Sequence, residues 1–375
     1  MRFLPVRFPR GSKFVNLACL STGVCKLAGS SPSSVAVQVA TMRCHYVSEV
    51  GAIRRREFIA LLGAAVSPLA AHAQSEVPVI GFLSSLSSDY ASYIAAAFRQ
   101  GVTETGFAEG RGVKYEYRYA NGDYSLLATM TDELVRRRVA VIAAGAPPAA
   151  LAAKKATSTI PIVFVVGFDP IEAKLVESYN RPGGNATGVH LITSPLGQKR
   201  LELILEVAPN ARTINMLVNP TFPNTEIEVR DVQAAAIANQ RELRTVNAST
   251  VAEIDAAFAT IADQHAGPLI VASDPFFLTR HDQFAALAAR HGILAIYPFR
   301  DYVAAGGLMS YGTSLAGAYR EIGRYAGRIL NGEKPANLPV IQPTIFEMVI
   351  NLKAAKALRL VVPPILRARA DEVIE

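Results

Sequence analysis

Short apolar runs alternate with longer segments of helical spacing along most of the chain, beginning at Val77. Residues 79–83 and 162–166 are continuous apolar runs, as expected of strands that are buried on both faces of a parallel sheet. Residues 113–119 alternate with period two, which places Val113 and three tyrosines on one face of a further strand. Strand and helix patterns follow one another in turn, and this order predicts an α/β fold.

The alternation comes in two series that meet near Leu196. In the first, we expect strands at residues 79–83, 113–119, 139–143, 162–166 and 185–191, with helices at 93–105, 125–138 and 171–178. In the second, we expect strands at 213–218, 243–246, 269–272 and 294–296, with helices at 197–207, 224–239, 251–264 and 280–291. Each series is long enough for a sheet of its own, so we expect two doubly wound parallel-sheet lobes.

Three predicted elements follow the second series. A helix at residues 315–330, which Gly332 and Pro335 end, precedes a strand at 347–352 and a short helix at 354–358. Elements left over after both sheets indicate that the chain crosses between the lobes more than once. We therefore assign residues 77–193 plus 307–335 to the first lobe, and residues 194–306 plus 336–375 to the second.

The segment before this body has the layout of an export signal. Three arginines at residues 54–56 precede an apolar run at 58–71, and Ala71-His72-Ala73 is an A-x-A-type cleavage site. The arginine pair before Phe58 resembles the twin-arginine type. The run is shorter than the ~20 residues that span a bilayer, and a buried core helix is the alternative. We expect a signal peptide at 54–73, cleaved after Ala73, and a periplasmic protein.

Residues 1–53 show neither a helical nor a strand period and contain clusters of Gly, Ser and Pro. An export signal normally stands at the N-terminus, so an extension of this length before one is unusual. Two interpretations stay open. Either the start codon is misassigned and translation begins near Ile53, or the segment is a genuine disordered extension.

The positive charge and the cysteines both lie in the N-terminal segment. Residues 1–73 hold nine of the 38 Lys and Arg and two of the 31 Asp and Glu, which leaves 29 of each in the remainder. A neutral body removes the basis for a nucleic-acid-binding surface, so we expect no nucleic-acid partner. Cys19, Cys25 and Cys44 also precede residue 74, so the remainder needs no disulfide and has no cysteine metal site.

Five motifs occur in order along the mature chain and carry a family resemblance. They are residues 80–85 (IGFLSS), 217–220 (LVNP), 274–277 (DPFF), 306–312 (GGLMSYG) and 349–358 (VINLKAAKAL). Each motif alone is weak, but five in this order are specific. From Val77 to Glu375 the chain resembles the ABC-transporter substrate-binding protein family related to tryptophan-binding receptors.

The resemblance implies a type I periplasmic-binding-protein fold with three crossover strands between the lobes. It implies a solute-binding protein that takes a small-molecule ligand, docks on an ABC permease and its ATPase, and needs no cofactor. Relatives in the family bind aromatic amino acids. The lipobox cysteine of some relatives is absent near the cleavage point, so we expect no lipid anchor there, and we expect a monomer.

The carboxyl ends of the predicted strands supply candidate ligand-binding residues, because ligands of open parallel sheets lie beyond these ends. In the first lobe the candidates are Ser84, Ser85, Gly145, Ala146, Pro147 and Asp169. In the second lobe they are Asn219, Asp274 and Tyr297, and the returning segment adds Tyr311 and Gly312.

These candidates have the chemistry that an amino acid needs. Serine hydroxyls and helix N-terminal N–H groups bind a carboxylate, and an aspartate pairs with an ammonium group. Tyr297, Phe276 and Tyr311 offer rings for stacking. The set favours an aromatic amino acid or a related aromatic acid.

Each candidate also has a purely structural interpretation. Ser84 and Ser85 are placed to cap the helix that follows them. The Asp-Pro pairs at residues 169 and 274 have the sequence of a helix cap followed by a first-turn proline. Phe276 fits core packing better than ligand contact. The sequence leaves these alternatives open.

The body of the chain shows no enzyme motif. Its four histidines (His190, His265, His281 and His291) have no metal-binding spacing, and neither a G-x-S-x-G elbow nor a G-x-G-x-x-G after the first strand is present. We expect a transport receptor and not an enzyme. The alternatives are an exported ligand sensor that reports to a membrane kinase and, less favoured, a small-molecule enzyme of doubly wound fold.

Overall fold

The structure is a computed structural model that describes residues 17–19, 25–27, 77–264 and 267–375. The chain divides into two compact units, Met1–Ala71 and His72–Glu375. In the first unit, β1 (Leu17–Cys19) pairs antiparallel with β2 (Cys25–Leu27), although the sequence shows no strand period there. The predicted signal peptide at 54–73 and the rest of the extension lie outside the described residues.

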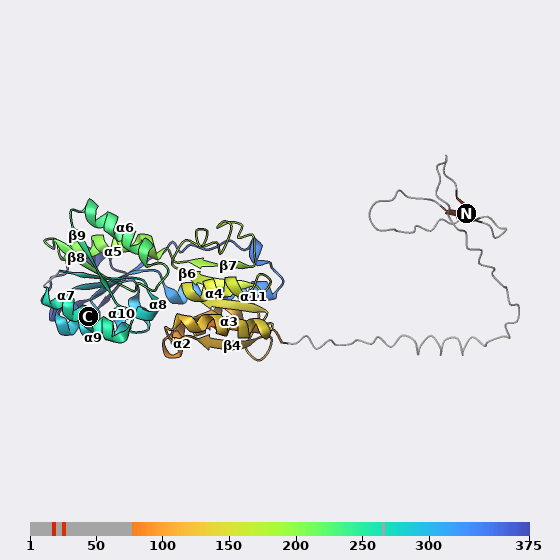
Figure 1. Cartoon of the computed structure of the whole chain (residues 1–375), viewed down its shortest axis with the longest axis horizontal. Helices are drawn as coiled ribbons and strands as arrows, with labels where there is room; N and C mark the ends of the chain where they lie inside the picture. The colour runs from red at the N-terminus through yellow and green to blue at the C-terminus, as the bar shows by residue number, and fades with distance from the viewer. Residues whose placement is uncertain (1–16, 20–24, 28–76, 265–266) are drawn as a thin grey trace. The chain divides into compact units, whose positions relative to one another are not determined.

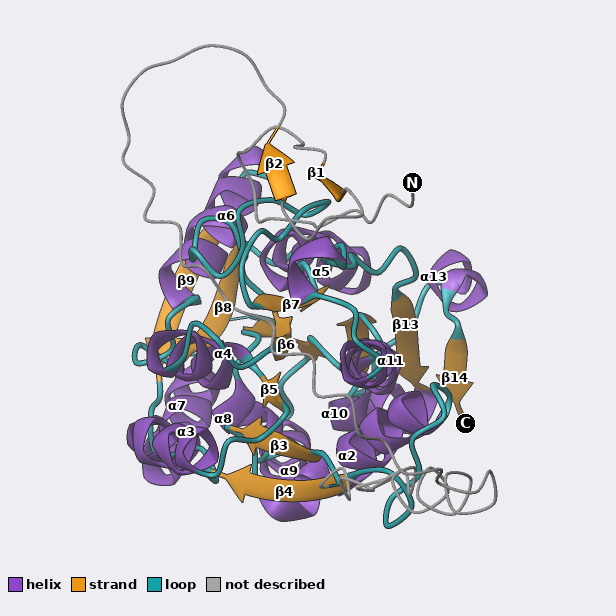
Figure 2. Ribbon diagram, turned by 90° about the vertical axis from the view of Figure 1, so that its right-hand side faces the viewer, coloured by secondary structure: helices purple, strands orange, loops and turns teal. Residues whose placement is uncertain are grey.

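The first sheet of the second unit has five parallel strands in the order β4-β3-β5-β6-β7, which Figure 2 shows in succession. They are β3 (Val79–Ser84), β4 (Lys114–Tyr119), β5 (Val141–Gly145), β6 (Ile162–Val166) and β7 (Ala186–His190). Neighbouring residues face opposite helix layers: Phe82 shares a core with α2 (Ser88–Thr103), whereas Leu83 shares one with α3 (Leu127–Arg136) and α4 (Pro147–Ala156). Helices therefore cover both faces, as the continuous apolar runs predict.

The second sheet has seven strands in the order β14-β13-β12-β11-β10-β8-β9. Figure 1 labels its β8 and β9, which lie in a different lobe from β6 and β7. They are β8 (Thr213–Val218), β9 (Glu242–Asn247), β10 (Leu269–Val271), β11 (Ala295–Tyr297), β12 (Met309–Gly312), β13 (Glu347–Asn351) and β14 (Glu372–Ile374). All neighbours are parallel except β12 and β13. One face shares a core with α5 (Thr193–Val207) and α6 (Thr225–Ala238), the other with α7 (Val251–Asp263), α9 (His281–His291) and α10 (Arg300–Ala304). The expected fold class is confirmed.

Helix α11 (Leu315–Leu330) packs in the first lobe although it follows β12 of the second sheet. Glycines bring it against α2. A Cβ at Gly323 would lie 2.1 Å from the carbonyl oxygen of Phe98, and one at Gly101 would lie 2.0 Å from that of Arg320. No side chain fits at either position, so the two helix backbones are in direct contact.

Between β7 and β13 the chain crosses from one sheet to the other three times. It leaves the first sheet after β7, returns after β12 to enter α11, and leaves again after Ile341, which bonds on both sides to β7 at 2.9 Å. Within residues 307–335, which we assigned to the first lobe, α11 packs in that lobe, whereas β12 pairs with β11 and β13 of the second sheet. Likewise, the first residues of 336–375 lie beside β7 in the first lobe.

The predicted helix at 171–178 is a set of turns. Asp169 Oδ1 accepts the N–H of Ile171 at 2.7 Å, and Lys174 takes a φ of +56°, so the helical hydrogen-bond ladder cannot continue. The pattern also misses α8 (Pro275–Leu278), α10, α13 (Pro364–Arg369) and β14, which are too short to show a period. The remaining elements are η1 (Tyr124–Leu126), η2 (Pro335–Asn337) and α12 (Leu352–Ala357). Among the described residues, no helix is both long and apolar enough to cross a bilayer.

Candidate ligand-binding site

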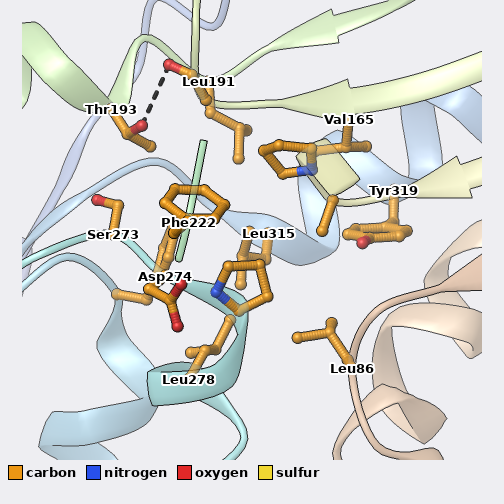
Figure 3. Close-up of a pocket in the computed structure, with 15 residues that line it drawn as sticks. Leu86, Val165, Leu191, Thr193, Phe222, Ser273, Asp274, Leu278, Leu315 and Tyr319 are labelled. Carbon is orange, nitrogen blue, oxygen red and sulfur yellow. Dashed lines mark hydrogen bonds between the residues drawn. The ribbon is translucent and has the colours of Figure 1, made fainter. Parts of the chain in front are cut away.

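A cavity of about 50 Å³ is lined by residues that follow strands of both sheets (Figure 3). The strand order of each sheet reverses, between β3 and β5 in the first lobe and between β8 and β10 in the second. Loops that leave the strands on either side of such a reversal diverge and open a crevice. Ala146 and Pro147 follow β5, and Ser273 and Asp274 follow β10, so both crevices contribute to this cavity.

The cavity walls are mainly apolar and carry three aromatic rings. Figure 3 shows Leu86, Val165 and Tyr319 of the first lobe across the cavity from Phe222 and Asp274 of the second. Phe299, which precedes α10, supplies the third ring. A lining of apolar side chains and rings with few polar groups is typical of small-molecule sites.

Asp274 is the ionisable group of the cavity. Its Oδ1 accepts the N–H of Phe277 at 2.9 Å and caps α8, and its Oδ2 accepts the hydroxyl of Tyr124 at 3.1 Å and Nδ2 of Asn219 at 3.2 Å. These hydrogen bonds hold the carboxyl group at the wall of the cavity. Burial raises the pKa of Asp274 to about 6, and the carboxylate is the main form at neutral pH.

The Tyr124–Asp274 hydrogen bond joins the two lobes beside the cavity. Tyr124 belongs to η1 in the first lobe, and burial raises the pKa of its hydroxyl, which therefore stays a donor. The lobes also touch nearby, because a Cβ at Gly122 would lie only 3.0 Å from the ring of Phe276. Contacts at Asp274 and its neighbour Phe276 thus join the two lobes.

The polar residues at the back of the cavity are Thr193 and Ser273. The N–H and hydroxyl of Thr193 both donate to the carbonyl of Gly167, at 3.2 Å and 3.1 Å (Figure 3). The N–H of Ser273 donates to the buried carboxylate of Glu228 at 3.1 Å. Both residues are thus oriented by partners outside the cavity.

Three of the predicted site residues, Ala146, Pro147 and Asp274, line the cavity. Three more lie directly behind the lining. Each contacts a residue of the lining. Asn219 donates a hydrogen bond to Asp274, and Ser84 Oγ accepts the N–H of Leu86 at 3.2 Å. A Cβ at Gly145 would lie 2.7 Å from the hydroxyl oxygen of Tyr319. Ser85 is buried next to them, and its hydroxyl has no partner among the described residues.

The other predicted site residues do not line the cavity and make structural contacts outside it. Tyr297 is fully buried and stacks on Tyr302, with ring centroids 4.7 Å apart. Asp169 caps a turn, and the carbonyl of Tyr311 accepts a hydrogen bond from Arg200. A Cβ at Gly312 would lie 1.8 Å from the carbonyl oxygen of Pro298, so this glycine allows a close backbone approach. Phe276 does not line the cavity, and its ring lies 3.7 Å from the Arg280 guanidinium.

The strand-end rule misses most of the apolar lining. Tyr319 and Leu315 come from α11, which is a helix and has no place in that rule. Phe222 stands four residues beyond the end of β8. Thr193 could have been found, because it follows the predicted strand at 185–191.

No metal-binding chemistry accompanies this cavity. Across residues 77–264 and 267–375, His, Asp and Glu side chains nowhere gather in groups of three that could hold an ion.

The cavity, with its apolar rings and the Asp274 carboxyl group, is suited to holding a small molecule that has an apolar ring and a positively charged group.

Comparisons with known proteins match most of the chain. The family model for "ABC transporter substrate binding protein" matches residues 76–374. A tyrosine-binding protein of Clostridioides difficile (strain R20291) is 27% identical over 261 residues, which cover 70% of this chain and 75% of that protein.

Solved structures share the fold over about four fifths of the chain. The ABC domain from Streptococcus pneumoniae in complex with L-Trp is 27% identical with a TM-score of 0.72, and the match covers 79% of this chain and 99% of that one. A conserved domain protein from Vibrio cholerae is 25% identical with a TM-score of 0.74, over 80% and 100% of the two chains.

Proposed function

The chain belongs to the family of ABC transporter substrate-binding proteins, and from this membership we propose that it captures an aromatic amino acid and delivers it to an ABC import permease. The observation that carries the proposal is a buried carboxylate, Asp274, in the wall of an apolar cavity that also carries three aromatic rings. Binding occurs in the periplasm, after export under the predicted signal.

In this proposal Asp274 binds the ligand's ammonium group. A hydrogen bond to a charged group in a site with little water contributes about 1.5–3 kcal/mol. The Tyr124 hydroxyl and the Asn219 amide orient the carboxylate, so little freedom is lost when the ligand arrives. Ala146 and Pro147, at the amino end of α4, lie beside the ligand carboxylate, where the helix dipole is favourable.

The ring of the ligand occupies the apolar part of the cavity. Tyr319, Phe222 and Phe299 supply aromatic contacts there, and aromatic pairs contribute about 0.5–1.5 kcal/mol beyond area burial. The names of two relatives support this ligand class: one is a tyrosine-binding protein and the other holds L-Trp, and each is 27% identical to this chain.

A thermal-shift screen of the purified protein tests the proposal. A ligand that binds only the folded state stabilises it by RT ln(1 + [L]/Kd), which is about 2.7 kcal/mol at a hundredfold excess over Kd. We expect L-tyrosine, L-tryptophan or L-phenylalanine to raise the melting temperature by several degrees, and L-alanine and myo-inositol not to. A screen in which no aromatic amino acid shifts the transition would refute the ligand class, and turnover of any of them would refute the receptor.

A further inference from the structure

We propose that the buried ion pair of Arg200 and Glu228 is a positioning element of the ligand site, which holds Ser273 and Thr193 in place and anchors the crossover segments to the second lobe. This inference rests on the proposed function, because the ligand site that the pair positions is the one proposed above. Neither residue lines the cavity, so both act through the residues that do.

The pair is removed from water. Arg200 on α5 and Glu228 on α6 have side chains that are 0% and 1% exposed, and Arg200 Nη2 lies 2.7 Å from Glu228 Oε1. It is one of 14 ion pairs in the described residues, and in each of the others at least one side chain is 20% exposed or more. A charge pair in such a place calls for a reason other than solubility.

Both members of the pair reach Ser273. Glu228 accepts the N–H of Ser273 at 3.1 Å (Oε2) and 3.3 Å (Oε1), and Arg200 Nη2 donates to its hydroxyl oxygen at 3.4 Å. Ser273 lines the cavity and directly precedes Asp274. The pair therefore fixes the backbone from which the ligand-binding carboxylate extends.

Arg200 also reaches the ends of two crossovers. Its Nη2 donates to the carbonyl of Thr193 and its Nη1 to that of Tyr311, both at 3.3 Å. Thr193 in turn bonds twice to Gly167 in the first lobe. One guanidinium thus connects the cavity wall, the crossover after β7 and the end of β12, and only a planar group with several donors can do this.

Stability gives no sufficient account of the pair. Desolvation of two charges costs free energy that their attraction often fails to recover, and apolar replacements of similar volume are often as stable. Burial raises the pKa of Glu228 and lowers that of Arg200, while their mutual attraction opposes both changes. Arg200 Nε has no partner in the part of the chain that the structure describes. The pair's distinctive property is its set of directed hydrogen bonds to Ser273, Thr193 and Tyr311.

The test separates positioning from stability with a double variant, Arg200→Met/Glu228→Leu, in the full chain. We expect it to fold, to bind L-tyrosine and L-tryptophan at least about 10-fold more weakly than the wild type, and to exchange the amide protons of residues 193 and 273 at least about 10-fold faster. The matched control is Arg328→Met/Glu333→Leu, which removes an exposed pair of the same 2.7 Å length and should change neither measurement.

Arg200→Lys is the second variant. It keeps a positive charge beside Glu228 but replaces the planar guanidinium and its several N–H donors with a single ammonium group. We expect the same direction of change as in the double variant, because one ammonium cannot reach three acceptors on different segments. If the double variant folds, unchanged ligand affinity and unchanged amide exchange would overturn the inference. If it fails to fold, unchanged affinity and exchange in Arg200→Lys would overturn it. If the wild type binds neither amino acid, the ligand proposal fails, and the exchange rates alone decide on the positioning role.

Discussion

Asp274 combines the two interpretations that its sequence context allows. The Asp-Pro pair does begin a helix, since Oδ1 caps α8, yet the same carboxylate lines the cavity. Its pKa of about 6, raised by burial, means that the folded protein keeps a charge where water is scarce. Such a group destabilises the free protein and becomes favourable when a cation arrives.

Asp274→Asn should therefore remove a pH dependence from the stability of the free protein and weaken ligand binding. A carboxyl whose folded pKa is raised from 3.8 to about 6 loses stability as pH rises through that range, by about 3 kcal/mol at pH 8. The variant lacks this titration, so its stability relative to the wild type should rise by about 3 kcal/mol between pH 4 and pH 8. Denaturant unfolding at several pH values measures this.

Calorimetry on the same variant should show at least about 30-fold weaker binding of the aromatic amino acid. Asp169→Asn is the matched control, because it also changes an Asp before proline at a strand end but lies outside the cavity. Its ligand affinity should stay within about twofold of the wild type. Equal losses in both variants would mean that Asp274 has no specific role.

At this scale the sequence selects some residues of the candidate cavity but not the direction of each side chain. The strand-end rule selects Ala146, Pro147 and Asp274, which line the cavity. It selects Tyr297 equally, yet that ring packs on Tyr302 in the core, because neighbouring residues of a strand point to opposite faces. Which face receives the last residue depends on the exact strand end, and β11 ends one residue beyond the predicted strand.

At the scale of elements, the strands are predictable because their residues form continuous buried apolar runs. The strand predicted at 213–218 coincides with β8, and the helix predicted at 315–330 coincides with α11. The segment at 171–178 shows the opposite case, since a local hydrogen bond of Asp169 overrides its helical spacing. Helix spacing alone also gives no sign that α11 contributes Tyr319 to the cavity.

The contact of α2 with α11 should be sensitive to a single methyl group. Gly323→Ala places a Cβ against the carbonyl of Phe98, and such overpacking costs about 1–3 kcal/mol. It should also weaken ligand binding, because Tyr319 stands one turn away on the same helix. Thermal or denaturant unfolding together with calorimetry measures both effects.

Gly317→Ala on the same helix is the control for this change. Its Cβ would lie 3.5 Å from that of Ser314, an ordinary contact, and alanine favours a helix by up to about 1 kcal/mol over glycine. The control should be neutral or stabilising. If both substitutions behaved alike, close packing of α2 and α11 would not limit stability.

At the scale of the whole second unit, three crossings join two sheets, and contacts beside the cavity hold the lobes together. The sequence predicts two lobes and repeated crossings because elements remain after each series. It does not place β12 in the second sheet, since a strand of four residues has no pattern that distinguishes one sheet edge from another. The Tyr124–Asp274 bond connects residues 150 positions apart, and no local pattern predicts such a pair.

Tyr124→Phe should shift the free protein toward an open arrangement of the lobes. The variant removes a hydrogen bond to a carboxylate, which contributes about 1.5–3 kcal/mol to the closed state. Small-angle scattering of the free protein should show a larger radius of gyration, and saturating ligand should restore closure. Tyr115→Phe is the control, because its hydroxyl makes no hydrogen bond within the described residues. Unchanged scattering of the Tyr124 variant would exclude this bond as a latch.

The central claim is that the cavity recognises an aromatic ring and an ammonium group together, and one calorimetric comparison tests it most directly. L-Tyrosine and its deaminated analogue, 3-(4-hydroxyphenyl)propionate, share the ring and the carboxylate but differ in the ammonium group. Because loss of one partner of a buried charge pair costs about 2–5 kcal/mol, we predict that tyrosine binds at least about 30-fold more tightly at pH 7.5. Equal affinities of the two compounds, or no binding of either, would contradict the account.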